Sequence, residues 1–218
     1  MSRTQRLLVV LVLNLALIAG LVAVGVTAHS LAVLAEGSDY LMDAAGVGVA
    51  LLAIHLSARP PSRERPEGYP NATNVAALVN GGWLLILELV VASAAVDRLI
   101  TGTPQVDGWP ILVVSGIAAL MMTAGAVILH GDADDGDGEG EAKERDLSVA
   151  AILLDTVADA AAAAGVAAVG GIILATGGWY WLDPAVALAI AVVVAYHALA
   201  LIRKVVGRLR SAAAESRG

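Results

Sequence analysis

Two pairs of aspartates lie within long apolar stretches of this chain, and within each pair the residues are four positions apart. The pairs are Asp39 with Asp43 and Asp155 with Asp159. A four-residue spacing places both carboxylates of a pair on one face of a helix. A carboxylate near the centre of a membrane-spanning helix costs roughly 2.5–3.5 kcal/mol on insertion scales, so such groups are functional candidates by default. No Lys or Arg stands within the apolar stretches to neutralise these acids.

Four carboxylates that converge from two helices can form an oxygen cage for a divalent cation. By residue count, Asp43 lies roughly 18 Å and Asp159 roughly 22 Å from the outer ends of their helices, so the two pairs share a depth near the bilayer midplane. Without a cation the carboxylates would repel one another and hold protons. A cation would displace those protons, because carboxylate ligands bind in the deprotonated form. The pattern predicts a metal/proton exchanger rather than a passive pore, which requires weak and multiple sites.

The composition predicts the elements that carry these acids. Of the 218 residues 58% are hydrophobic and 15% are charged, and the mean hydropathy is +0.79, whereas a soluble domain carries about 25% charged residues. A spanning helix needs about 20 mainly apolar residues. Six such runs occur: Leu7–Ala28, Leu31–Leu56, Val75–Val96, Trp109–Leu129, Leu147–Leu174 and Pro184–Ile202. We expect an all-α membrane protein with a six-helix transmembrane transport domain at residues 1–210 and a short cytoplasmic tail at 211–218.

The basic residues predict the orientation, because cytoplasmic segments of membrane proteins carry an excess of Lys and Arg. In a six-span chain only Arg98 of the 13 basic residues falls on the outer side. Both termini are therefore expected in the cytoplasm, and the protein in the cell membrane. The cytoplasmic segment His130–Asp146 is rich in acids and Gly, and its spacing does not fit an EF-hand. We expect a solvated loop, with weak cation collection as the alternative.

Several classes of function are excluded by composition. The chain has no Cys, which excludes disulfides, Cys-ligated zinc and thiol catalysis. The formal net charge is −7, Phe is absent, and no basic patch carries interleaved aromatic residues. Nucleic acid is therefore not an expected partner.

The stretch from Ser30 to Asp43 resembles the second-helix signature of the cation diffusion facilitators, membrane exporters of divalent metals. In that family an [HDN]xxxD pair on the second helix and an [HD]xxxD pair on the fifth form the transport site, and the two aspartate pairs match these positions. The resemblance continues through Val79-Asn80-Gly81 and Trp181-Leu-Asp183-Pro184, and so covers the whole six-helix region. It implies proton-coupled export of a metal ion as substrate, with no cofactor.

The chain also departs from the family pattern. The loop before the third helix reads Arg65-Pro-Glu-Gly-Tyr69 and lacks the usual His, and Ala94 stands where a Glu is common. About 16 residues follow Ile202, too few for the cytoplasmic ferredoxin-like domain that most members carry. The resemblance therefore implies a membrane-only form, for which a homodimer is an expectation without that usual route to dimerisation.

All four proposed ligands are oxygen donors, which suit Mn²⁺ and similar hard ions. We therefore expect Mn²⁺ as the favoured cargo, with Zn²⁺ or Fe²⁺ as alternatives. Glu36 lies one turn before Asp39 and is either an accessory ligand on the exit path or part of a solvated helix end. Glu88, on the third helix, is either a proton acceptor or a structurally paired carboxylate.

The fifth helix carries small residues at Gly165, Gly170 and Gly171. Such a surface allows close packing of helices. We expect it to hold the fifth helix against the second or to form a dimer contact.

Other functions are weighed against transport. An intramembrane aspartyl protease needs a Gly-x-Gly-Asp context that neither Asp155 nor Asp159 has. A phospholipid head-group transferase needs a longer Asp/Gly/Arg motif on one helix, which is missing. We therefore expect no enzyme. A non-transporting partner or metal sensor of the same fold is the remaining alternative.

Overall fold

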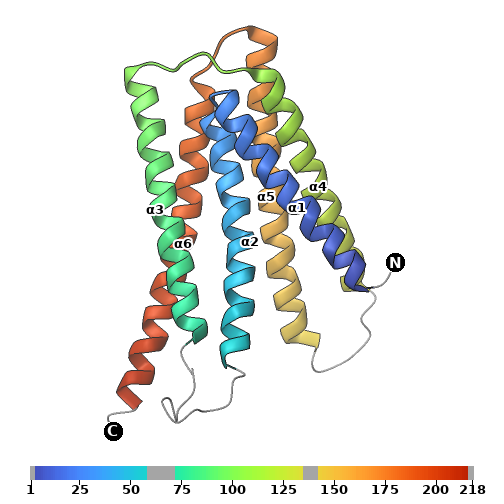
Figure 1. The fold of residues 1–218 in the computed structure, drawn as a ribbon, viewed down its shortest axis with the longest axis vertical. Helices are drawn as coiled ribbons and strands as arrows, with labels where there is room; N and C mark the ends of the chain where they lie inside the picture. The colour runs from blue at the N-terminus through green and yellow to red at the C-terminus, as the bar shows by residue number, and fades with distance from the viewer. Residues whose placement is uncertain (1–2, 58–71, 135–141, 216–218) are drawn as a thin grey trace.

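A computed structural model describes residues 3–57, 72–134 and 142–215, which form six α-helices and contain no strand (Figure 1). The helices are α1 (Arg3–Thr27), α2 (Leu31–Ser57), α3 (Ala72–Thr101), α4 (Gly108–Asp134), α5 (Ala142–Thr176) and α6 (Leu182–Glu215). They run side by side along the long axis of the molecule. Because the number of helices is even, the first residues of α1 and the last residues of α6 lie toward the same end of the bundle (Figure 1). We call the opposite end, with residues 28–30, 102–107 and 177–181, the outer end, following the orientation predicted above.

Each of the six predicted apolar runs corresponds to one helix, although the first run passes the end of α1 by one residue, Ala28, and the helices are longer than the runs. α4 continues to Asp134 and α5 begins at Ala142, so both ends of the expected acidic loop are helical. Its residues 135–141 lie outside the described part of the chain. α6 continues to Glu215, so most of the expected tail is also helical. Hydropathy marks only the part of a helix that contacts hydrocarbon, whereas the backbone hydrogen bonds continue beyond it.

The surface of the bundle is apolar, as a lipid environment requires. Within the described residues three helical stretches are long and apolar enough to cross a bilayer: Asn74–Thr101, Thr156–Thr176 and Leu182–Ser211. The outer end carries three exposed tryptophans, Trp109, Trp179 and Trp181. Tryptophan gathers at membrane–water interfaces, so these side chains fit the edge of the bilayer. The predicted all-α membrane protein with six helices is confirmed.

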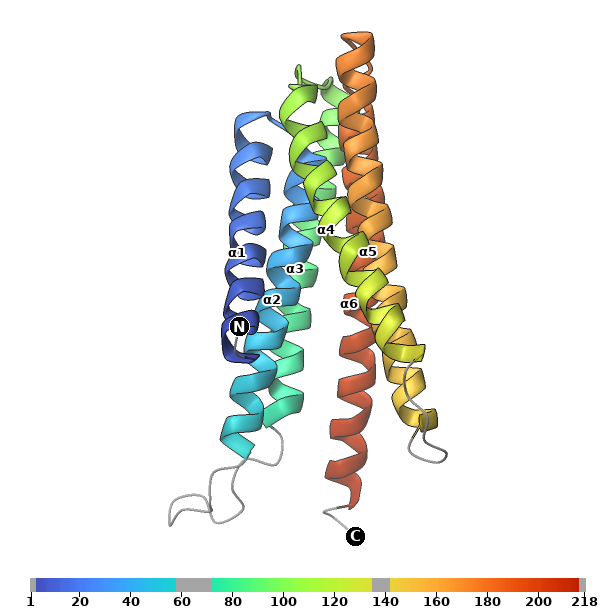
Figure 2. The ribbon, with the colours of Figure 1, turned by 90° about the vertical axis from the view of Figure 1, so that its right-hand side faces the viewer.

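The helix α2 is the centre of the bundle. It packs against α1, α3, α5 and α6, and it reaches α4 through a side-chain hydrogen bond described below. The remaining helices form two close pairs, α3 with α6 and α4 with α5 (Figures 1 and 2). Among the side chains that the structure describes, the buried core lies mainly in the outer half and includes residues of all six helices. Its members without solvent exposure include Leu21, Ala32, Val33, Ala35, Ala95, Ile111, Ala118, Ala163, Val166 and Ala187.

The turn from α1 to α2 is short and held by hydrogen bonds. The N–H of Ser30 donates to the carbonyl of Gly25 at 2.9 Å, and that of His29 donates to Val26. His29 has a φ of 58°, the left-handed conformation found after the last residue of many helices. The hydroxyl of Ser30 then accepts from the N–H of Val33 at 3.1 Å, as an N-cap does. α1 therefore ends and α2 begins within three residues.

Two glycines let α4 and α5 approach backbone to backbone. A Cβ on Gly170 would lie 2.6 Å from the backbone nitrogen of Leu112 and 2.9 Å from the carbonyl oxygen of Gly108. The small residues of α5 were expected to face α2 or a second copy of the chain. That expectation was wrong for Gly170, which packs on α4. Gly165 has open space around it, so small size alone does not identify the contact face.

The substitution Gly170→Ala should destabilise the bundle, because the new methyl group meets backbone atoms that cannot rotate away. We expect a loss of about 1–3 kcal/mol or more, measured as a lower midpoint of thermal unfolding in detergent. Gly165→Ala is the matched control on the same helix. It should keep or raise the midpoint, since alanine favours helix by about 1 kcal/mol over glycine. Equal midpoints for the two variants would contradict the close α4–α5 contact.

Candidate functional site

The predicted metal ligands lie on two helices of the bundle. Asp39 and Asp43, the α2 pair, are on α2, and Asp155 and Asp159, the α5 pair, are on α5. The side chains of Asp39 and Asp159 are half-buried, and both take part in interactions within the protein.

The side chains of Asp43 and Asp155 lie outside the described part. Among the described side chains, no group of three or more His, Cys, Asp or Glu has the arrangement of a metal site. Only one member of each pair belongs to that set, so the four-aspartate site stays a prediction.

Two contacts relate the depths of the pairs. The Ser115 hydroxyl of α4 donates to the Glu36 carboxylate of α2 at 2.5 Å, which sets these residues at one level. The close approach of Gly108 and Gly170 aligns α4 with α5 in the same way. Counting along the three helices from these contacts, the α2 pair and the α5 pair fall at the same depth to within about one helical turn, about 5.4 Å.

The positions of the α2 pair also lie on an interior stripe of α2. Glu36 at one end of this stripe contacts α4. Gly46 at the other end faces α3, where the amide nitrogen of Asn80 lies 3.0 Å from the place of a Gly46 Cβ. Residues 36, 39, 43 and 46 follow the three- and four-residue spacing of one helix face. Asp39, between these two ends, therefore lies on the side of α2 that faces α3 and α4.

Glu36 is a buried residue, with 3% of its surface exposed. Its Oε2 accepts the hydrogen bond from Ser115, and its Oε1 has no hydrogen-bond partner among the described residues. The alternative of a solvated helix end was therefore wrong. The reason is that α4 packs over this turn of α2, which no local pattern on α2 could indicate.

Glu88 lies in the middle of α3 and has no solvent exposure. Neither of its carboxylate oxygens has a hydrogen-bond partner within the described residues. The alternative of a structurally paired carboxylate therefore receives no support from this part of the chain. The contacts of Asn80 with Gly46 and of Arg98 with His29 align α3 with α2. By this alignment Glu88 falls at about the depth of Asp39.

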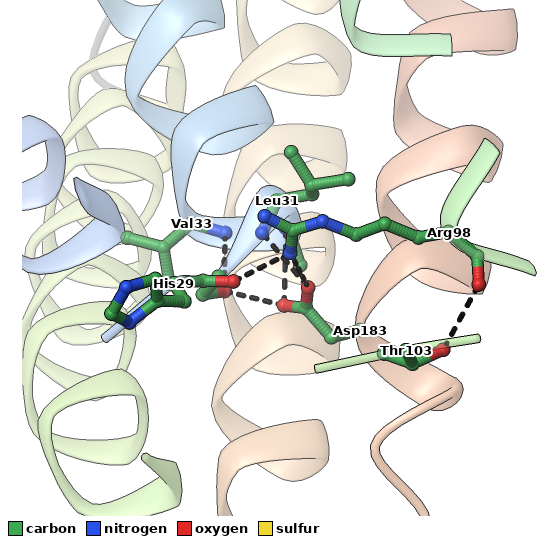
Figure 3. Close-up of polar contacts among 8 residues, drawn as sticks. His29, Leu31, Val33, Arg98, Thr103 and Asp183 are labelled. Carbon is green, nitrogen blue, oxygen red and sulfur yellow. Dashed lines mark hydrogen bonds and ion pairs between the residues drawn. The ribbon is translucent and has the colours of Figure 1, made fainter. Parts of the chain in front are cut away.

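A buried polar cluster joins three helices at the outer end (Figure 3). Asp183, in the first turn of α6, has no solvent exposure. It accepts hydrogen bonds from the hydroxyl of Ser30 at 2.5 Å, the N–H of Leu31 at 2.8 Å and the N–H of Ala32 at 3.2 Å. We call Asp183, Ser30, Arg98 and the carbonyl of His29 the outer clasp.

Arg98 brings α3 into the outer clasp. Its Nη1 donates to the carbonyl oxygen of His29 at 2.6 Å and lies 3.7 Å from Oδ2 of Asp183 (Figure 3). The guanidinium thus offsets the charge of a carboxylate that water does not reach. The hydroxyl of Thr103 donates to the carbonyl of Arg98 at 3.4 Å, which holds the end of α3 as well.

Sequence reasoning missed the outer clasp, although two signals of it were visible. Arg98 was the one basic residue on the outer side, and Asp183 stood directly before Pro184 at a helix start. Neither signal indicates which residues complete the cluster, because its partners lie 69 to 153 positions apart in the sequence.

Comparison with known proteins agrees with this architecture. Residues 7–209 match the family model of the cation efflux transmembrane domain. A zinc transporter ZitB of Yersinia pseudotuberculosis serotype I (strain IP32953) is 29% identical over 204 residues, covering 93% of this chain and 62% of the relative.

Two further relatives carry different names. A proton-coupled zinc antiporter SLC30A2 of Homo sapiens is 27% identical over 188 residues, 86% of this chain and 50% of the relative. A cadmium, cobalt and zinc/H(+)-K(+) antiporter of Bacillus velezensis (strain DSM 23117 / BGSC 10A6 / LMG 26770 / FZB42) is 27% identical over 178 residues, 79% of this chain and 53% of the relative. The chain thus spans between half and about 62% of the length of these curated relatives.

The family match covers most of the chain and all six helices, and it agrees with the resemblance carried by the two aspartate pairs. It is a match to a transport domain, so the protease and transferase alternatives do not apply. The chain belongs to the cation efflux family of integral membrane transporters.

Proposed function

We propose that the protein exports divalent metal cations in exchange for protons, through a site formed by the α2 pair and the α5 pair. The observation that carries the proposal is the alignment of these two pairs at one depth inside a cation efflux domain. Four oxygen ligands at that depth suit a divalent cation, and they exchange protons for it because only the deprotonated carboxylates coordinate.

The packing of the outer half bears on the route by which the cation leaves. Between the aspartate pairs and the outer end, the described side chains of Leu21, Val33, Ile111 and Val166 have no solvent exposure. Release to the outside therefore requires the outer halves of the helices to separate. Glu36 and Glu88 lie at or just outside the depth of the α2 pair, and we propose them as accessory groups on that route, for metal or for protons.

We propose Zn²⁺ as the first cargo to test. The all-oxygen ligand set favours Mn²⁺ when taken alone, but the relatives are named for zinc, or for cadmium, cobalt and zinc. Zinc binds carboxylates well and stands above manganese in the Irving–Williams order. A site of four carboxylates is therefore compatible with zinc. Mn²⁺ is the second cation to test.

The proposal predicts that Asp43→Ala and Asp159→Ala abolish metal-driven proton flux while the protein still folds. Each removes one of four ligands, and the remaining three hold the cation more weakly. The measurement uses purified protein in proteoliposomes loaded with a pH-sensitive dye and challenged separately with Zn²⁺, Mn²⁺, Fe²⁺ and Co²⁺. The ranking of the wild-type responses identifies the preferred ion.

Asp97→Asn is the matched control, because it neutralises an exposed carboxylate on α3. It should leave the flux unchanged. Normal flux in either aspartate-pair variant would rule out the four-carboxylate site. A folded wild-type protein that responds to none of the four metals would instead favour the non-transporting partner or sensor.

A second prediction concerns Glu36. Ser115→Ala removes the hydrogen bond to a buried carboxylate, and an unsatisfied buried acceptor costs about 1–3 kcal/mol. We expect a lower midpoint of thermal unfolding in detergent. Ser93→Ala is the control, since the Ser93 hydroxyl is exposed and donates only to Val90 of its own helix among the described residues. Equal stability of the two variants would show that Glu36 does not depend on Ser115.

A further inference from the structure

The first turn of α2 is held by a carboxylate from another helix. The two oxygens of Asp183 accept from three donors on successive residues, Ser30, Leu31 and Ala32. The N–H groups at the start of a helix all point along its axis, but successive residues lie about 100° apart around it. A single carboxylate that satisfies all three therefore fixes both the position of α2 along its axis and its rotation about that axis.

Arg98 adds α3 to this arrangement. It donates to the carbonyl of His29, the residue that ends the turn before α2, and it lies beside Asp183 (Figure 3). The start of α2 is thus related to α3 and α6 at the same time. These are also the helices that form one of the two close pairs in the bundle.

The α2 pair lies on the helix that the outer clasp holds. Asp39 and Asp43 are about 14 to 20 Å along α2 from Ser30. A slip of one residue at the clasp would move both carboxylates by about 1.5 Å and turn them by about 100°. The residues of a binding site must be held within about 0.5 Å and 10–20° of their working geometry. The α2 pair can therefore meet the α5 pair only in the register that the clasp sets.

We propose that Asp183 is a positioning residue for the metal site: it caps α2 from α6, together with Arg98, and so sets the depth and rotation of the α2 pair and the affinity of the site for its cation. The proposal rests on the proposed function, because it assigns Asp183 a role toward the same site. A cap that served folding alone would change the yield of folded protein and leave the affinity unchanged.

The first experiment measures Zn²⁺-driven proton flux in proteoliposomes over a series of Zn²⁺ concentrations, normalised to folded, inserted protein. Asp183→Ala should raise KM for Zn²⁺ by about 10-fold or more. Asp183→Asn keeps one acceptor oxygen and should show a smaller rise. Arg98→Gln should shift KM in the same direction, because the clasp then loses its link to α3. Ser93→Ala is the control and should keep the wild-type KM.

The second experiment measures the position of α2 directly. The chain has no Cys, so spin labels can be attached to cysteines introduced at Gly48 on α2 and Val193 on α6. Both positions are exposed, and a Cβ at Gly48 meets no atom within 4 Å. Pulsed electron paramagnetic resonance then gives the distance between the labels. The distance should shift or broaden on Asp183→Ala and stay as in the wild type on Ser93→Ala.

The outcomes separate the two hypotheses. A raised KM together with an altered label distance supports the positioning role. An unchanged KM, or an unchanged distance, in well-folded Asp183→Ala protein overturns it. If that variant does not fold, Asp183→Asn and Ser30→Ala decide by the same two measurements. If the wild type moves none of the tested metals, the proposed function fails, and the label distances still decide whether Asp183 positions α2.

Discussion

A bilayer offers no hydrogen-bond partners, so the backbone N–H and C=O groups that enter this bundle must be satisfied by the protein itself. The constraint is strongest for α2, which lies at the centre and begins with free N–H groups. Asp183 satisfies the N–H groups of Leu31 and Ala32, and Ser30 satisfies that of Val33. Because α2 touches each of the other helices, its placement decides how the rest of the bundle packs.

Polar groups follow α2 in layers from the outer end inward. The outer clasp comes first and the hydrogen bond from Ser115 to Glu36 comes second. The positions of the α2 pair follow further along the helix. Between these layers the packing is apolar and made of small side chains such as Ala32 and Ala35. The helix that carries half of the proposed metal site is therefore tied to α6 and α3 at one level and to α4 at the next.

The sequence predicted the six helices well, because a spanning run of apolar residues is a local signal. It also indicated the family, since the four-residue spacing of the aspartate pairs is a local pattern too, whereas the metal site built from those pairs stays a prediction. It could not predict that Asp183 caps α2, because its partner Ser30 lies 153 positions earlier in the chain. Nor could it predict that α4 covers Glu36. The partner of Gly170 was missed for the same physical reason: a stripe of small residues indicates close packing, but the choice of neighbour depends on how all six helices are arranged.

The origin of the α2 cap has a consequence for the biosynthesis of the protein. α2 leaves the ribosome early, whereas Asp183 follows about 150 residues later. At typical rates of synthesis this interval is roughly 8 to 30 s. During that time the first turn of the central helix must find hydrogen bonds elsewhere, in interfacial water or in the insertion machinery. The insertion of α6 replaces those temporary partners, and a nascent chain that stops after α5 leaves the N–H groups of Leu31 and Ala32 without the Asp183 carboxylate.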